Sequence, residues 1–149
     1  MMEKLIFTTT ARILEDWAMM LVDPASPELK IFEVESPFLV ASLSFRGAVN
    51  GTYQVVCQRG FSEALVANLL GEDVPEDNLQ SEMDALREMV NVLSGNLLTT
   101  CYGSDTVFEL MPPEVHQVAR EKLTSLFEKP VFCYLADENP VAVSFSLDV

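Results

Sequence analysis

The sequence predicts a single α+β domain over residues 1–149. Two stretches, near residues 11–22 and 79–100, place apolar residues at the spacing of helices that bury one face. Two more, near residues 39–57 and 129–147, alternate apolar and polar residues around a turn signal, which is typical of antiparallel hairpins. A chain of 149 residues is long enough to bury a sizeable core.

Composition and charge argue against several classes of partner. The chain is 49% hydrophobic and 21% charged, as folded proteins are. Its 23 acidic residues against 9 basic ones give a formal net charge of -14, which disfavours nucleic acid and anionic membrane surfaces. No apolar run approaches the roughly 18 residues of a membrane span and no leader opens the chain, so we expect a cytoplasmic protein.

The cysteines predict buried thiols. Cys57, Cys101 and Cys133 are odd in number, lack CxxC spacing and lie among apolar residues, as reduced thiols of a cytosolic protein do. A cysteine nucleophile paired with His116, the only histidine, is the alternative, although nothing in the sequence brings the two together. The scarcity of histidine also argues against a zinc site, so we expect no metal of the chain's own.

The first half predicts a helix, a strand and a hairpin in that order. The helix runs over 11–22, is capped within 8–10 and is stopped by Asp23-Pro24. A short β-prone segment follows at 30–35. The hairpin then forms around Asn50-Gly51, which we expect to supply the positive φ angles of a tight turn.

The middle of the chain predicts two helices. The first covers 61–70. The second and longest runs over 79–100, and Asp77 with Gln80 resembles a capping box at its start.

The last third repeats the order of the first. A strand is expected at 107–110, and the second hairpin pairs 129–135 with 141–147 around Asp137–Pro140. The stretch 114–127 is ambiguous between an extended segment and a helix, and we favour a short helix.

The order helix, strand, hairpin occurs twice, which indicates pseudo-repeats over about 8–58 and 79–149. The two helices differ in one respect. When Glu15 is aligned with Glu88, Ala18 stands at the position of Asn91, and no Gly-Asn pair follows. One helix alone carries the polar residues described next.

Four residues of the longest helix form a polar stripe. At about 100° per residue, Asp84, Glu88, Asn91 and Gly95 fall within an arc of roughly 60°. The opposite side is apolar and can pack on a core; it consists of Met83, Leu86, Val90, Leu93 and Leu97. The helix therefore packs with one side and presents the other.

Glu88 and Asn91 are close enough to act on one small target. The Asn91 amide cannot act as a general base near neutral pH, but it can hold a water in a chosen orientation. The Glu88 carboxylate can bind a lysine or arginine of another molecule. Two such residues are enough to contribute to phosphoryl transfer, if a partner supplies the remaining catalytic groups. An ordinary solvated helix face is the alternative.

The pattern Asp84-xxx-Glu88-xx-Asn91-xxx-Gly95-Asn96 resembles the active-site signature of the CheC/CheX/FliY chemotaxis phosphatases. The duplicated layout resembles that family over nearly the whole chain, and a single copy of the signature is typical of CheX. The resemblance implies a CheC-like two-layer fold, with a mostly antiparallel sheet covered by two long helices. It also implies a homodimer.

The resemblance further implies hydrolysis of the aspartyl phosphate on a CheY-like response regulator. Asn91 would orient the attacking water and Glu88 would pair with the regulator's lysine, while Mg²⁺ would belong to the regulator. Asp84 would touch the partner or be a solvated acid. Gly95 would allow close approach by another chain or packing without a side chain, and Asn96 is expected to bond locally.

One departure from the family leaves a second function open. Such proteins often carry a proline followed closely by a glycine after the strand, whereas Pro112-Pro113 is followed by no glycine here. A non-enzymatic binding or scaffolding module in two-component signalling is therefore the alternative. A purely structural homodimer is a third possibility.

Overall fold

The computed structural model describes residues 2–71, 78–128 and 130–148. These segments form one seven-stranded sheet in which every strand pair is antiparallel. The strands are β1 (Val22–Ala25), β2 (Phe38–Gly47), β3 (Gly51–Cys57), β4 (Phe108–Leu110), β5 (Glu114–Val118), β6 (Phe132–Ala136) and β7 (Asn139–Leu147). The helices are α1 (Met2–Asp16), α2 (Arg59–Leu70) and α3 (Leu79–Tyr102). The predicted α+β class is confirmed.

The strand order is β1-β6-β7-β3-β2-β4, and β5 also pairs with β2. The strand that precedes each hairpin therefore lies beside the hairpin of the other half of the chain. The two hairpins meet where β3 pairs with β7, with Tyr53 opposite Phe145. The duplication over 8–58 and 79–149 stays a prediction.

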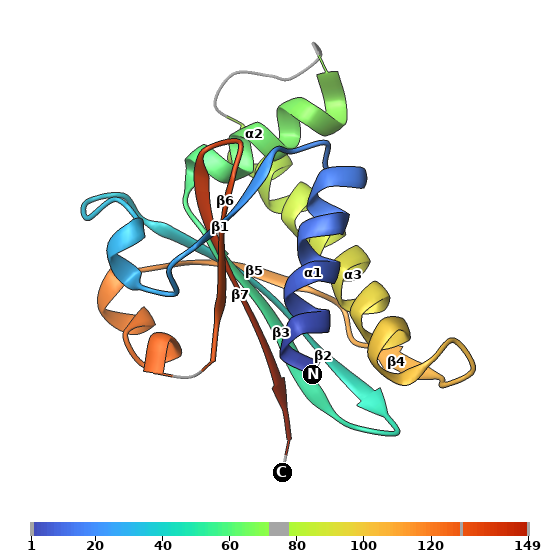
Figure 1. Cartoon of the computed structure of the whole chain (residues 1–149). Helices are drawn as coiled ribbons and strands as arrows, with labels where there is room; N and C mark the ends of the chain where they lie inside the picture. Colours follow the sequence, from blue (N-terminus) through green and yellow to red (C-terminus); the bar gives the residue numbers. More distant parts are fainter. Residues whose placement is uncertain (1, 72–77, 129, 149) are drawn as a thin grey trace.

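The main core lies between the sheet and two helices. α1 and α3 lie side by side along one face, and α2 lies at the end of the sheet against α3 (Figure 1). The sheet buries alternate side chains toward the helices, as its pleat requires. Among the fully buried ones are Leu39, Ala41, Phe45, Tyr53, Val55, Tyr134 and Val141.

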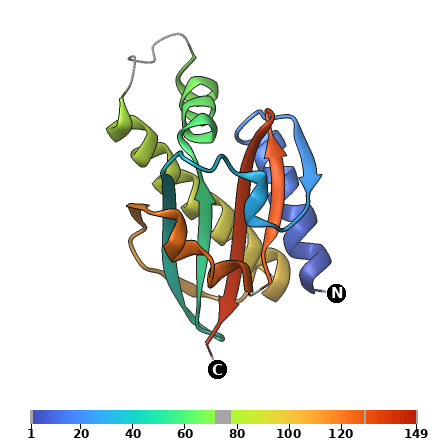
Figure 2. The same cartoon turned by 90° about the vertical axis from the view of Figure 1, so that its left-hand side faces the viewer.

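The opposite face of the sheet carries a second, smaller core. Three short 3₁₀ turns cover it: η1 (Leu29–Ile31), η3 (Arg120–Leu123) and η4 (Leu126–Glu128). Figure 2 shows these turns in front of the strands, with α3 behind them. Their apolar residues pack on the strand side chains that point away from the helices, including Phe38, Val56, Cys133 and Ala142.

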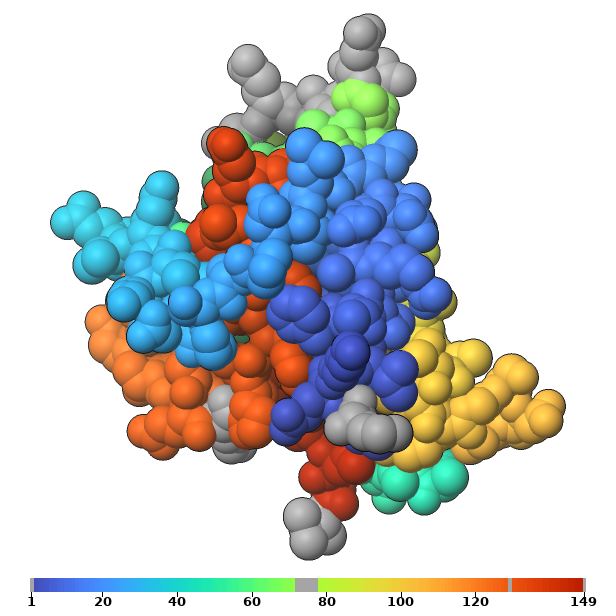
Figure 3. All heavy atoms as spheres, viewed as in Figure 1, coloured from blue at the N-terminus to red at the C-terminus, as the bar shows by residue number. Residues whose placement is uncertain are grey.

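The expected bounds of the first helix were wrong. α1 begins at Met2, so Thr8–Thr10 lie inside it, and it ends at Asp16 rather than at Asp23-Pro24. Met19 adopts a left-handed φ of 57°, and the Met20 amide donates to the Leu14 carbonyl at 3.0 Å, which closes the helix end. Figure 3 shows the atoms of α1 (blue) at the front of the molecule, with those of α3 (yellow) beside them on the right.

The first single strand lies earlier than expected. Residues 30–35 contain part of the turn η1 and no strand, whereas β1 forms at Val22–Ala25 and contains Asp23-Pro24. Its partner is β6, with Pro24 opposite Tyr134. Proline is tolerated there because β1 is the edge of the sheet.

Both hairpins are confirmed, but the tight turn with positive φ angles is in the second hairpin and not in the first. The last pair between β2 and β3 joins Phe45 to Gly51, and neither Asn50 nor Gly51 has a positive φ. Instead, Asp137 and Glu138 have φ values of 48° and 69° in the two-residue turn between β6 and β7.

The prediction of a short helix within 114–127 was wrong. Glu114–Val118 forms β5, with Ala41 opposite Val115, and η3 and η4 follow. β2 offers an open edge there, and pairing with it satisfies the backbone of the segment. The strand β4 at Phe108–Leu110 lies within the expected range.

Candidate functional site

α3 is the scaffold of the candidate site. Asn78 caps its start by accepting a hydrogen bond from the Ser81 amide at 3.0 Å. The expected cap, Asp77, lies outside the described residues. The helix ends where Gly103 takes a φ of 91° and its amide donates to the Thr99 carbonyl at 2.8 Å.

The apolar side of α3 is buried as its spacing predicts. Met83 is half-buried, and the other four predicted positions are almost fully buried: Leu86, Val90, Leu93 and Leu97. The helix is therefore anchored along most of its length. Its remaining side faces solvent, and all four residues of the polar stripe lie there.

The side chains of Glu88 and Asn91 are accessible on the solvent-facing side of α3. Glu88 is exposed and Asn91 is half-buried, one turn further along. Within the segments that the structure describes, neither the Glu88 carboxylate nor the Asn91 side-chain amide has a hydrogen-bond or ion-pair partner. Both groups are therefore available to another molecule.

Asp84 differs from these two residues. Its carboxylate accepts hydrogen bonds from Gln80 at 3.0 Å and from Arg87 at 2.8 Å, both on α3. The pair with Arg87 is a surface ion pair of the i,i+3 type, which contributes little stability. Asp84 is thus held along the helix and places an acidic oxygen at the start of the stripe.

Asn96 bonds locally, as expected. Its side-chain amide donates to the Val92 carbonyl at 2.7 Å, within the helix itself. The Ser94 hydroxyl does the same toward Val90 at 2.7 Å. Gly95, between them, is half-buried and has no positive φ.

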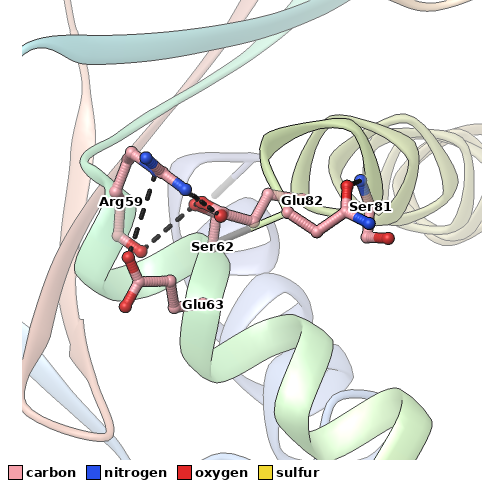
Figure 4. A network of polar contacts seen from close by, with 6 residues as sticks. Arg59, Ser62, Glu63, Ser81 and Glu82 are labelled. Atoms are coloured by element: carbon pink, nitrogen blue, oxygen red, sulfur yellow. Dashed lines mark hydrogen bonds and ion pairs between the residues drawn. The ribbon is translucent and has the colours of Figure 1, made fainter. Parts of the chain in front are cut away.

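A buried ion pair fixes the start of α3 against α2 (Figure 4). Glu82 is 3% exposed and accepts two hydrogen bonds from Arg59, at 3.1 and 2.6 Å. The Ser62 hydroxyl donates to the same carboxylate at 2.5 Å. Three charge-assisted bonds thus compensate the desolvation of this carboxylate.

The sequence carried a signal for this ion pair. Glu82 falls among the buried positions of α3, about 120° around the helix from Glu88. A carboxylate in an apolar stripe requires a buried partner. The partner, Arg59, lies on another helix, so spacing along α3 does not identify it.

The cysteines do not form a nucleophilic site. All three are free; Cys57 and Cys133 are buried, and Cys101 is half-buried. Burial, with a smaller effect of Glu82, raises the pKa of the Cys57 thiol well above its usual range. His116 is exposed on β5 beside Glu114. A protonated buried thiol is a poor nucleophile.

In residues 2–71, 78–128 and 130–148, no three His, Cys, Asp or Glu side chains are grouped so that they could hold a metal ion. None of the helices there has the length and apolar character needed to cross a membrane.

Comparison with protein families decides where the chain belongs. The family model described as "Chemotaxis phosphatase CheX" matches residues 39–137, which is more than half of the chain. The chain belongs to the CheX family. The matched region contains α3 and all five residues of the predicted signature. No curated protein sequence matched.

Solved structures share the fold of this CheX-family chain. A CheX chemotaxis protein from Desulfovibrio desulfuricans is 24% identical with a TM-score of 0.72, covering 99% of each chain. The CheX–CheY–BeF3–Mg²⁺ complex from Borrelia burgdorferi is 13% identical with a TM-score of 0.65, covering 98% of this chain and 97% of that one. FliY from Thermotoga maritima is 14% identical, at a TM-score of 0.57 and coverages of 96% and 83%. The expected CheC-like fold is confirmed.

Proposed function

We propose that this chain hydrolyses the aspartyl phosphate of a CheY-like response regulator. The observation that carries the proposal is the pair Glu88 and Asn91, which lie on the solvent-facing side of α3 without partners in the described chain. Membership of a chemotaxis phosphatase family supports it. The Borrelia burgdorferi protein of the same fold forms a complex with CheY.

Asn91 orients the attacking water in this mechanism. Its amide oxygen accepts a hydrogen bond from the water and its NH₂ group donates to a phosphoryl oxygen. Water then attacks phosphorus, and the bond from phosphorus to the aspartyl oxygen breaks. The products are the aspartate carboxylate and inorganic phosphate, which retains the protons of the water.

Glu88 docks the regulator. Its carboxylate pairs with a lysine of the regulator's phosphoryl pocket, and a charge-assisted bond fixes the distance between Asn91 and the phosphoryl group. Mg²⁺ and the remaining catalytic groups belong to the regulator. Asp84, Gly95 and Asn96 support the surface around this pair, and we expect a cytoplasmic homodimer.

The test is phosphate release from the phosphorylated cognate regulator. Wild-type protein should accelerate release, and Asn91→Ala should lower kcat by about 100-fold through loss of positioning. Glu88→Ala should act mainly on KM, by about 10- to 100-fold, because it removes a charge-assisted bond. Unchanged rates in both variants, with the fold intact, would exclude the proposed roles.

A matched control is available on the far side of the sheet. Glu121 is exposed in η3, so Glu121→Ala removes one negative charge, as Glu88→Ala does, but away from α3. It should leave the rate of phosphate release unchanged.

A binding or scaffolding module is the second candidate. Pro112-Pro113 leads here into β5 with no glycine following closely, which departs from the family pattern. Stable binding of the regulator with an unchanged phosphoryl lifetime would favour this candidate over the enzyme.

A further inference from the structure

Gly95 occupies a helix interior that has room for a side chain. Among the residues that the structure describes, a Cβ atom built at this position meets no heavy atom within 4 Å outside the neighbouring residues and the local helix backbone. By contrast, a Cβ atom at Gly60 would lie 2.7 Å from the Asn139 side-chain oxygen. The backbone of Gly95 has no positive φ, so its conformation suits any residue. Packing against the described part of the chain therefore does not explain the glycine.

The glycine is unfavourable for α3 itself. Glycine in a helix interior is less stable than alanine because it loses more backbone entropy on folding. The side chains on either side do not cover the gap, since Ser94 and Asn96 both fold back onto carbonyls of their own helix. The surface of α3 is consequently open at this turn.

The gap lies beside Asn91. Gly95 follows Asn91 by four residues, so the two share one face of the helix. Bonds from Cα to Cβ tilt toward the helix N-terminus, and a side chain at position 95 would lean over the turn that carries Asn91. Asparagine is short, so its amide reaches a buried phosphoryl group only if the surrounding helix surface comes close to the partner.

We propose that the rim of the regulator's phosphoryl pocket packs directly against α3 at Gly95, and that the missing side chain allows Asn91 to reach the phosphoryl group. This inference rests on the proposed function. The occupant is a phosphorylated receiver domain that also presents a cation to Glu88, whose carboxylate is unpaired among the described residues. Gly95 is thus a specificity-determining position of the interface and not a requirement of the fold.

Substitution of Gly95 should move stability and activity in opposite directions. Gly95→Ala should raise Tm by about 2–4 °C through its helix propensity. It should also lower kcat/KM for the phosphorylated regulator about 10-fold, and Gly95→Leu should lower it further because the side chain is larger. If both variants keep kcat/KM within about twofold of wild type, the inference is wrong.

A control separates helix propensity from contact with the partner. Ala67 is exposed on α2, outside the stripe. Ala67→Gly should lower Tm by a similar amount and leave kcat/KM unchanged. A fall in kcat/KM in this variant as large as that in Gly95→Ala would mean that any change in helix stability, of either sign, lowers activity, which would overturn the role of Gly95.

Binding to the regulator activated with beryllofluoride, measured by calorimetry, separates failure of this inference from failure of the proposed function. If wild type binds but does not accelerate phosphate release, the enzyme proposal fails. Gly95 is then tested by Kd alone: weaker binding by Gly95→Leu supports the close approach, and equal binding refutes it. No binding by wild type refutes both.

Discussion

Glu82 and Glu88 lie about 120° apart around α3 and have opposite environments. Glu82 is 3% exposed and paired with Arg59 and Ser62, whereas Glu88 is exposed and has no partner in the described part of the chain. The buried ion pair and the apolar side of α3 together set which side of the helix faces inward. The Glu88 carboxylate is thereby kept in solvent, next to Asn91.

Removing one partner of the buried ion pair should lower the free energy of unfolding strongly, whereas replacing both partners by apolar residues should lower it much less. Arg59→Met leaves the Glu82 carboxylate buried without its cation and should lower the free energy of unfolding by about 3 kcal/mol. The double variant Arg59→Met, Glu82→Leu should recover most of this loss, because two apolar side chains need no compensation. Urea unfolding at neutral pH measures both. A double variant as unstable as the single one would contradict this account.

Asn68 should be required for the end of α1. Its side-chain amide donates to the carbonyls of Ala18 at 3.0 Å and Met19 at 3.3 Å, and to Asp137 at 3.2 Å. Asn68→Ala leaves the Ala18 and Met19 carbonyls without this donor and should lower the free energy of unfolding by about 1–3 kcal/mol. Thermal unfolding monitored by circular dichroism tests this.

Asn96→Ala is the matched control for that prediction. It removes one bond within α3 and gains helix propensity, so it should change stability by less than about 0.5 kcal/mol. An equal loss of unfolding free energy in the two variants would mean that the hydrogen bonds made by Asn68 to distant segments stabilise the protein no more than a bond within one helix does.

The turn between β6 and β7 should accept glycine. Glu138 is exposed and has a φ of 69°, which costs energy for any residue with a Cβ atom. Asp-Gly is a favoured pair in such two-residue turns, so Glu138→Gly should raise the free energy of unfolding by about 0.5–1 kcal/mol. Glu121→Gly on the far face, where φ is not positive, should not stabilise the protein.

Alkylation should distinguish the three cysteines. Burial raises the pKa of Cys133 to about 11 and that of Cys57 beyond the usual range, so both thiols stay protonated and covered near pH 8. Cys101 is half-buried at the end of α3, although burial raises its pKa as well. Iodoacetamide should therefore modify Cys101 first.

Mass spectrometry after timed alkylation checks this order. Cys101→Ser should abolish the early modification, and Cys57 and Cys133 should react only when the protein unfolds. Early modification of either residue in the native protein would contradict their burial.

The spacing of apolar and polar residues along the sequence was enough to predict the elements with a clear helical or strand period. α3, with its buried apolar side and its exposed polar stripe, follows from residue spacing alone, as do both hairpins. The five signature residues needed no tertiary information because they all lie on one helix. Their catalytic roles stay predictions.

Tertiary contacts decided where α1 ends and whether residues 114–118 form a helix or a strand, which residue spacing leaves open. Residues 17–21 continue a helical apolar pattern, yet α1 stops at Asp16 because Met19 turns and Asn68 binds the freed carbonyls. Val115 and Val118 suit a helix by spacing, yet they lie in β5 because β2 offers an unpaired edge. These choices depend on hydrogen-bond partners that are distant in the sequence.

The sequence by itself thus determined an amphipathic α3, its exposed Glu88 and the absence of a side chain at Gly95. Only the tertiary structure decided that Glu82 is anchored by Arg59 and that no other part of the described chain fills the space at Gly95. The physical reason is the range of the interactions. Helix periodicity acts over a few residues, whereas ion pairing and steric space depend on which elements the fold brings together.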